Sequence, residues 1–177
     1  MTKNLSYSFA ALAFACVIGA AVYEHLTVVP QWSAAPPASL TMFQGTYGLK
    51  PDKFWMLIHP VTLLLFVITL VLHWKTARRK NLLITLGGYA FVLCVTTIYF
   101  VPELISIITA PLSTTADSDL TARAKLWELL SIVRLGCLIV LSMVLFLGLT
   151  KDNAAKQHLR QPQNSSMDSK AQLATTH

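Results

Sequence analysis

The residue types best suited to chemistry lie inside or beside long apolar segments of the chain. Six of them are ionisable: Glu24, His25, His59, Glu103, Glu128 and Arg134. At the centre of a bilayer such a side chain costs roughly 2.5–3.5 kcal/mol on insertion scales, so a group of them marks a candidate site. Carboxylate, imidazole and guanidinium together suit proton transfer and the stabilisation of an anion.

Glu24, His59 and Arg134 are the candidate catalytic residues. With Glu24 or Glu128 nearby, His59 could serve as a general base, because a carboxylate partner orients an imidazole and raises its basicity. His59 or Glu24 would then remove a proton from a phenolic hydroxyl or an activated C–H bond. Arg134 would stabilise the resulting anion in surroundings of low dielectric constant.

Helical spacing gives these groups companions on the same helix face. We expect three such stripes to face inward, because polar groups that face lipid go unpaired. The stripes are Trp55, His59 and Thr62; Thr96, Tyr99 and Glu103; and Trp127, Ser131 and Arg134. The candidate substrate-binding residues are Trp55, Tyr99, Glu103, Trp127 and Glu128.

Two other interpretations of the polar residues stay open. Arg134 and Glu24 could form one buried ion pair that fixes helix packing and does no chemistry. Alternatively, Glu24, His25, His59 and Glu128 could bind a metal ion. The paired Glu-x-x-His motifs of a di-iron bundle do not occur in the sequence. We therefore expect no metal and no cofactor.

Four apolar segments must position these residues. They cover about residues 7–29, 54–74, 82–101 and 126–149, the first ended by Pro30 and the third ended or kinked by Pro102. Each has the ~20 residues that a helix needs to cross a bilayer, and lipid cannot satisfy open backbone groups. The sequence therefore predicts an all-α integral membrane four-helix bundle over residues 1–150. Ala11, Ala15 and Gly19 predict a close-packing seam on the first helix.

Composition agrees with a membrane protein. Of the 177 residues, 54% are hydrophobic and only 12% are charged, about half the charged share of a soluble domain. The net charge of +6 could suggest nucleic acid, but the basic residues do not form a face interleaved with aromatic residues. We expect membrane lipids and a lipophilic small molecule as partners, and no nucleic acid.

The positions of Lys and Arg predict the orientation. Nine of them fall in the N-terminus, the 75–81 loop and the tail, against four in the other two loops. By the positive-inside rule, both termini face the cytoplasm, which suits the inner (plasma) membrane of a bacterium. Counted from the cytoplasmic helix ends, Glu24, His59 and Arg134 all lie about 22–24 Å into a ~30 Å core.

The connecting segments give further expectations. Residues 30–53 are rich in Pro, Gly and aromatic residues, which suits either a lid or an interfacial belt. Asp117, Ser118 and Asp119 are candidate N-caps for a fourth helix that begins near Leu120. His73 is expected to lie among lipid headgroups. The polar segment 151–177 is expected to be a disordered cytoplasmic tail.

The last helix carries a resemblance to a known family. Trp127-Glu-Leu-Leu-Ser-Ile-Val-Arg134 is a Trp-x6-Arg pattern that follows a helix ending in Phe100-Val101-Pro102. The arrangement resembles the anthrone-oxygenase-like family of small four-helix membrane proteins, over roughly residues 7–150. In that family an asparagine closely follows the proline, where this chain has Glu103-Leu104. The resemblance implies a four-helix bundle that oxygenates a polycyclic phenol without metal or flavin.

Two classes of function therefore stay open. One is a membrane enzyme, oxygenase-like or otherwise redox-active, that acts on a lipophilic phenolic or quinone-like substrate. The other is a non-catalytic membrane protein, such as a transporter subunit, a lipid-binding protein or a partner of a larger complex, whose buried charges only fix helix packing.

Overall fold

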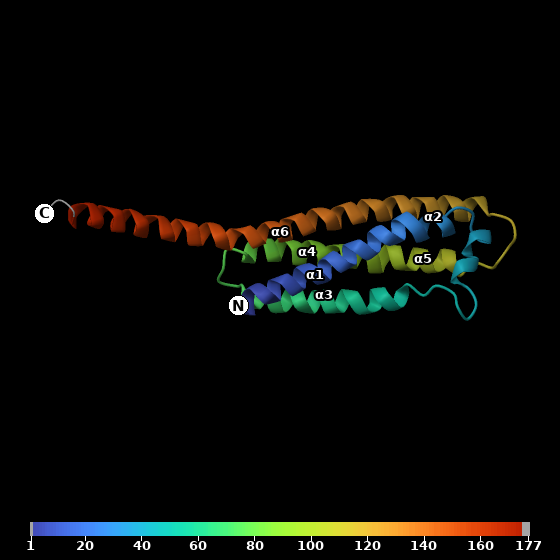
Figure 1. The fold of residues 1–177 in the computed structure, drawn as a ribbon. Coiled ribbons are helices and arrows are strands. Elements are labelled where there is room, and N and C mark those ends of the chain that lie inside the picture. Colours follow the sequence, from blue (N-terminus) through green and yellow to red (C-terminus); the bar gives the residue numbers. More distant parts are fainter. Residues whose placement is uncertain (1, 175–177) are drawn as a thin grey trace.

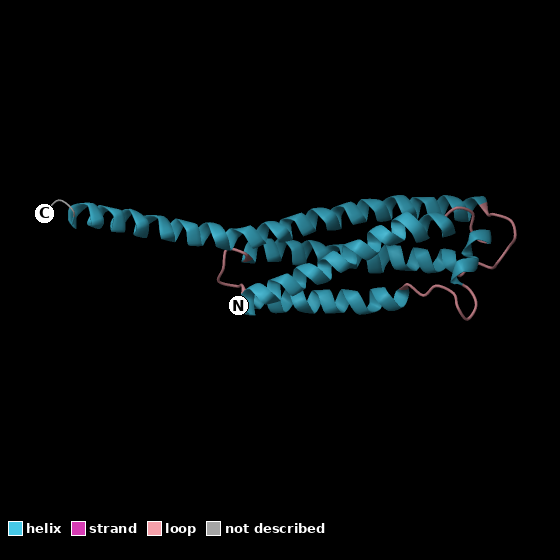
Figure 2. Ribbon diagram, in the orientation of Figure 1, coloured by secondary structure: helices cyan, strands magenta, loops and turns pink. Residues whose placement is uncertain are grey.

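The chain folds into a bundle of long helices with one helix end extending well beyond it (Figure 1). The computed structural model describes residues 2–174, with side chains described for residues 2–151. No strand occurs in the described residues (Figure 2). The elements in order are α1 (Thr2–Tyr23), η1 (Glu24–Val28), α2 (Val29–Trp32), η2 (Ala38–Phe43), α3 (Asp52–Leu72), α4 (Arg79–Val95), η3 (Thr96–Phe100), α5 (Val101–Ile108) and α6 (Ser118–Ala174).

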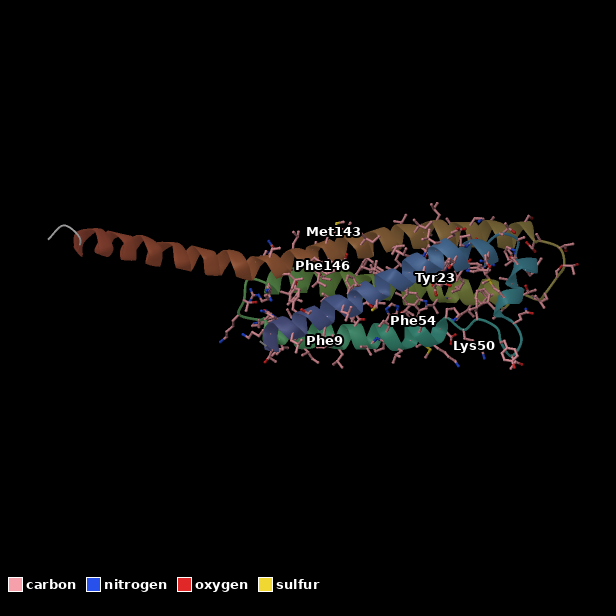
Figure 3. The ribbon with its side chains drawn as sticks, viewed as in Figure 1. Phe9, Tyr23, Lys50, Phe54, Met143 and Phe146 are labelled. Atoms are coloured by element: carbon pink, nitrogen blue, oxygen red, sulfur yellow. The ribbon has the colours of Figure 1, made fainter. Side chains whose placement is uncertain are left out.

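These elements stack into four rods, each long and apolar enough to cross a membrane. The rods are Thr2–Trp32, Asp52–Leu72, Arg79–Ile108 and Ser118–Lys151. Around the bundle, α1 packs against α3 and α6, and α4 packs against the same two helices. Large apolar side chains such as Phe9, Met143 and Phe146 are exposed on the outside (Figure 3), as expected for helices surrounded by lipid.

Two of the rods contain a π-helical turn immediately before a Val-Pro pair. η1 precedes Val29-Pro30, and η3 precedes Val101-Pro102. Proline lacks an N–H and its ring clashes with the carbonyl one turn back, and the wider π turn relieves this clash. The expectation that Pro30 ends the first helix is therefore wrong, because the rod continues to Trp32.

The core falls into two clusters of buried side chains. The larger one includes Tyr7, Phe14, Phe66 and Tyr89, and the Phe14 ring meets the rings of Phe66 and Tyr89 edge to face. The predicted seam on α1 is not formed: Ala11 is buried, but Ala15 and Gly19 are exposed. The large rings of Tyr7 and Phe14, seven residues apart, define the buried face of α1 instead. The smaller cluster comprises Val29, Trp32, Leu40, Phe100, Ile107, Ala124 and Trp127.

The bundle has two different ends, which we name by their loops. The short-loop end holds the start of α1 and the turn 73–78, and the rest of α6 projects beyond it to Ala174 (Figure 1). The disorder expected for residues 151–177 falls, except for Lys151, on a stretch whose side chains are not described, and it stays a prediction. The long-loop end holds the segments 33–51 and 109–117.

At the short-loop end, polar side chains join the helices through backbone carbonyls. The Tyr7 hydroxyl donates to the Leu145 carbonyl at 2.5 Å, and Asn81 Nδ2 donates to the Val144 carbonyl at 2.6 Å. His73 is only 1% exposed and its Nε2 donates to the Lys3 carbonyl at 2.9 Å. The placement of His73 among headgroups is therefore wrong, because its ring fastens the turn to α1.

At the long-loop end, two loops fold back over the bundle. The Asp117 backbone N–H donates to the Pro36 carbonyl at 2.9 Å, which ties the two loops together. Asp117 Oδ1 accepts the backbone N–H groups of Asp119 and Leu120, so Asp117, one of the three candidates from the sequence, caps α6. Gly45 takes a positive φ of 73° at the tip of the first loop, a conformation that favours glycine.

Candidate functional site

A cavity of about 320 Å³ lies between the first rod, the start of α3 and the loop before it. Its lining comprises Ala20, Tyr23, Glu24, Val28, Leu49, Lys50, Pro51 and Phe54. Tyr23, Lys50 and Phe54 lie near one another beside the start of α3 (Figure 3). The cavity opens to the outside, and most of its lining residues are apolar. Glu24 and Lys50 are the two charged side chains in this lining.

Glu24 is held at the cavity by a neighbouring helix. Its Oε1 accepts the indole N–H of Trp55 at 2.9 Å. No described residue forms a hydrogen bond with the other oxygen, Oε2. The π turn η1 begins at Glu24, and π turns inside α-helices occur often at functional sites. One carboxylate oxygen is therefore fixed, and the other is available to a ligand.

His59 lies on the other side of Trp55. The two rings stack with centroids 5.2 Å apart and planes 22° apart. His59 Nδ1 and the Tyr89 hydroxyl are 2.7 Å apart. Glu24 and His59 therefore both contact Trp55, Glu24 at the indole N–H and His59 at the ring face. His59 does not line the cavity.

Arg134 lies deeper in the bundle and makes no direct ion pair with Glu24. Its Nη1 donates to Thr96 Oγ1 at 3.1 Å and its Nη2 to Ser131 Oγ at 2.8 Å. The guanidinium also lies 4.3 Å from the centroid of the Phe100 ring. Its charge still acts on both Glu24 and His59. The Glu24–Arg134 pair considered from the sequence is thus an electrostatic interaction over a distance.

His25 has one ring nitrogen engaged and one buried without a partner. Nδ1 lies 2.7 Å from the Ala21 carbonyl, so this nitrogen carries the hydrogen. In a neutral ring Nε2 then carries the lone pair, and it is buried with no hydrogen-bond partner among the described residues. No group of three or more His, Cys, Asp or Glu side chains in the described part of the chain could hold a metal ion.

The remaining predicted site residues gather at the long-loop end, away from the cavity lining. Glu103 pairs with Arg123 at 2.8 Å. Glu128 accepts from Ser33 Oγ at 2.8 Å and from Lys125 at 3.0 Å.

The two aromatic residues of this group pack around the second π turn. Trp127 is buried, and its N–H donates to the Phe100 carbonyl at 2.9 Å. Tyr99 is 37% exposed and packs edge-on against Phe100. Of the predicted site residues, only Glu24 lines the cavity, and it is joined to His59 through the contacts that both make with Trp55.

Sequence reasoning missed three residues that shape the site. Tyr89 binds His59, Phe100 lies against the Arg134 guanidinium, and Lys50 lines the cavity mouth. Tyr89 and Phe100 appear in the sequence as ordinary aromatic residues of an apolar helix. Lys50 offered the one usable signal, a cation beside Pro51 at the start of a membrane helix.

In comparisons with known proteins, the chain matches no family model, no curated protein and no solved structure.

Proposed function

We propose that this protein is a membrane redox enzyme that binds a lipophilic phenol or quinol in the cavity beside Glu24 and removes a proton from its hydroxyl group. One observation carries the proposal: an apolar cavity in an apolar bundle contains a carboxylate with one oxygen fixed by Trp55 and the other unengaged. A volume of about 320 Å³ lies at the lower end of ligand pockets, which span roughly 300–1,000 Å³. The space suits one small aromatic ring system, with an apolar tail leaving through the open side.

The chemistry follows from the lining. The hydroxyl proton moves to Glu24 Oε2, and the electron pair of the broken O–H bond stays on the substrate oxygen. Lys50 in the lining and the positive charge of Arg134 stabilise the phenolate, because fixed positive charges lower the energy of an anion that forms near them. With dioxygen as the oxidant, a hydroquinone gives up two electrons and two protons, and the products are a quinone and hydrogen peroxide.

A second candidate is a non-catalytic binding protein. The observation that favours it concerns the other two candidate catalytic residues. The Nδ1 of His59 is engaged with Tyr89, and Arg134 donates to Thr96 and Ser131. Such bonds between neighbouring helices are typical of packing residues. In this case the cavity holds a lipophilic molecule and does not change it.

One experiment separates the two candidates. Protein in nanodiscs is titrated with lipophilic phenols and hydroquinones, with tryptophan fluorescence reporting binding and an oxygen electrode reporting turnover. We expect Glu24→Gln to abolish oxygen consumption. Glu103→Gln, the same change in the ion pair with Arg123, should leave oxygen consumption intact. Binding without oxygen consumption supports the binding protein. Turnover that survives Glu24→Gln contradicts the enzyme as proposed.

A further inference from the structure

Charge is strongly separated between the two ends of the bundle. Between residues 2 and 151, all six acidic side chains lie in the long-loop half: Glu24, Asp52, Glu103, Asp117, Asp119 and Glu128. The short-loop end carries six basic side chains: Lys3, Lys75, Arg78, Arg79, Lys80 and Lys151. Ion pairs at the long-loop end partly neutralise its cations. Between residues 2 and 151, no Asp or Glu lies at the short-loop end, and the next acidic residue in the sequence is Asp152.

Two buried side chains of the turn 73–78 bind α1 and hold the turn against it. His73 is buried and donates to the Lys3 carbonyl. Arg78, 4% exposed, donates to Asn4 Oδ1 at 2.9 Å and lies 5.2 Å from the centroid of the Tyr7 ring. Backbone bonds from Thr76 to His73 and from Arg79 to Thr76 close the turn. The turn is therefore ordered before it meets any partner.

The residues flanking these two anchors face outward. Trp74, Lys75, Arg79 and Lys80 are all exposed, and Trp74 is 51% exposed. The Arg79 guanidinium lies 5.3 Å from the centroid of the Trp74 ring. We define these four residues as the cationic turn. It combines an aromatic ring of the type that occupies the headgroup level with three cations held close together.

We propose that the cationic turn binds the headgroups of anionic phospholipids. Arg79 offers a planar fork of donors that matches a phosphate, and Lys75 and Lys80 add point charges on either side. Trp74 places its ring at the boundary between headgroups and acyl chains. Because the turn is already ordered, little conformational freedom is lost on binding. This inference is independent of the cavity and of the proposed enzyme.

The test measures lipid selectivity at the protein surface. The full-length protein is reconstituted into phosphatidylcholine vesicles that contain spin-labelled phosphatidylglycerol or spin-labelled phosphatidylcholine, and the motionally restricted fraction is compared. We expect the anionic label to be favoured about threefold or more at low salt, and less as salt rises. The triple variant Lys75→Gln/Arg79→Gln/Lys80→Gln should lose this preference.

Controls distinguish lipid binding at the cationic turn from an effect of the protein's net charge. The matched variant Lys50→Gln/Lys53→Gln/Arg123→Gln removes three cations from the other end and should keep the preference. Equal loss in both triple variants, or full retention in the cationic-turn variant, overturns the proposal. Should the triple variant fail to fold, Arg79→Gln and Trp74→Ala singly must each lower the preference, and failure of both to do so also overturns it. Displacement of the anionic label by 10 mM glycerol phosphate would instead identify a soluble phosphate ligand and contradict a lipid surface.

Discussion

The two ends of the bundle differ in the partners that most of their polar side chains bind. At the short-loop end, Tyr7, His73 and Asn81 donate to backbone carbonyls of neighbouring helices. Nearer the long-loop end, Glu24 and Arg134 bond to other side chains. Both π turns and the cavity lie in this second region.

The difference is between side chains that join helices and side chains that keep an atom free of hydrogen bonds. A backbone carbonyl has a fixed position, so a bond to it from another helix joins the two helices firmly. Glu24, which is bonded to the side chain of Trp55, keeps Oε2 unengaged. The short-loop end therefore joins the helices through backbone carbonyls, and the region of the cavity holds a carboxylate with one unengaged oxygen. The effects of substitutions at the two ends should therefore differ in size, and in whether stability or ligand binding changes.

The largest effect is expected from Tyr7→Ala. The substitution removes a fully buried ring and its bond to the Leu145 carbonyl, and it should lower the free energy of unfolding by about 3–5 kcal/mol. Tyr23→Ala on the same helix removes a ring that is 62% exposed, and it should cost less than about 1 kcal/mol. Denaturant unfolding in detergent measures both. Similar losses in the free energy of unfolding for the two variants would contradict the difference between the two ends of the bundle.

The next effect concerns the buried guanidinium. Arg134→Leu removes two hydrogen bonds and the contact with Phe100, which should cost about 2 kcal/mol. Arg123→Leu breaks a more exposed pair with Glu103, which is worth less than about 1 kcal/mol. Thermal melting of both variants in the same detergent tests the difference. Equal melting temperatures would mean that Arg134 contributes no more than a surface ion pair.

A smaller change in stability but a clear change in binding is expected from Trp55→Phe. The phenyl ring can still stack on His59, but the donor to Glu24 is lost. The free energy of unfolding should fall by about 1 kcal/mol. Affinity for a phenolic ligand should fall about tenfold, because Glu24 is no longer fixed at the cavity. Trp74→Phe, at an exposed site, serves as the control, and an equal loss of affinity there would contradict the role of Trp55.

The smallest effect should be local. Asp117→Ala removes the cap that accepts the N–H groups of Asp119 and Leu120, at a cost of about 1 kcal/mol or less. Hydrogen exchange should rise in the first turn of α6 and stay unchanged at the short-loop end. Asp119→Ala should leave the exchange of that turn unchanged. Faster exchange throughout α6 after Asp117→Ala would show that the two ends unfold together.

The four long helices could be predicted because a bilayer demands about 20 apolar residues per span. The cap at Asp117 was also readable, because a carboxylate before a helix has a known use. The stripe of Trp127, Ser131 and Arg134 does face inward. Each of these features depends on residues that lie close together in the sequence, so it can be recognised from their types and spacing.

The features that depend on contacts between helices could not be predicted. Nothing near His73 in the sequence indicates that it reaches the Lys3 carbonyl, 70 residues away. The small residues Ala15 and Gly19 suggested a seam, but the rings of Tyr7 and Phe14 set the packed face instead. The partner of His59 and the direction of the Arg134 donors likewise depend on how α4 and α6 rotate against their neighbours.

The π turns also affect how the chain could tolerate insertions and deletions. A π turn holds about one residue more than the α turn it replaces, and one residue corresponds to about 100° of helix rotation. Deleting a single residue such as Thr27 would restore α-helical phase but rotate Trp32 away from Trp127, where the two rings now meet 5.4 Å apart. The extra residue therefore sets the rotational phase between two halves of one rod: it lets Glu24 lie at the cavity while Trp32, eight positions on, lies in the core.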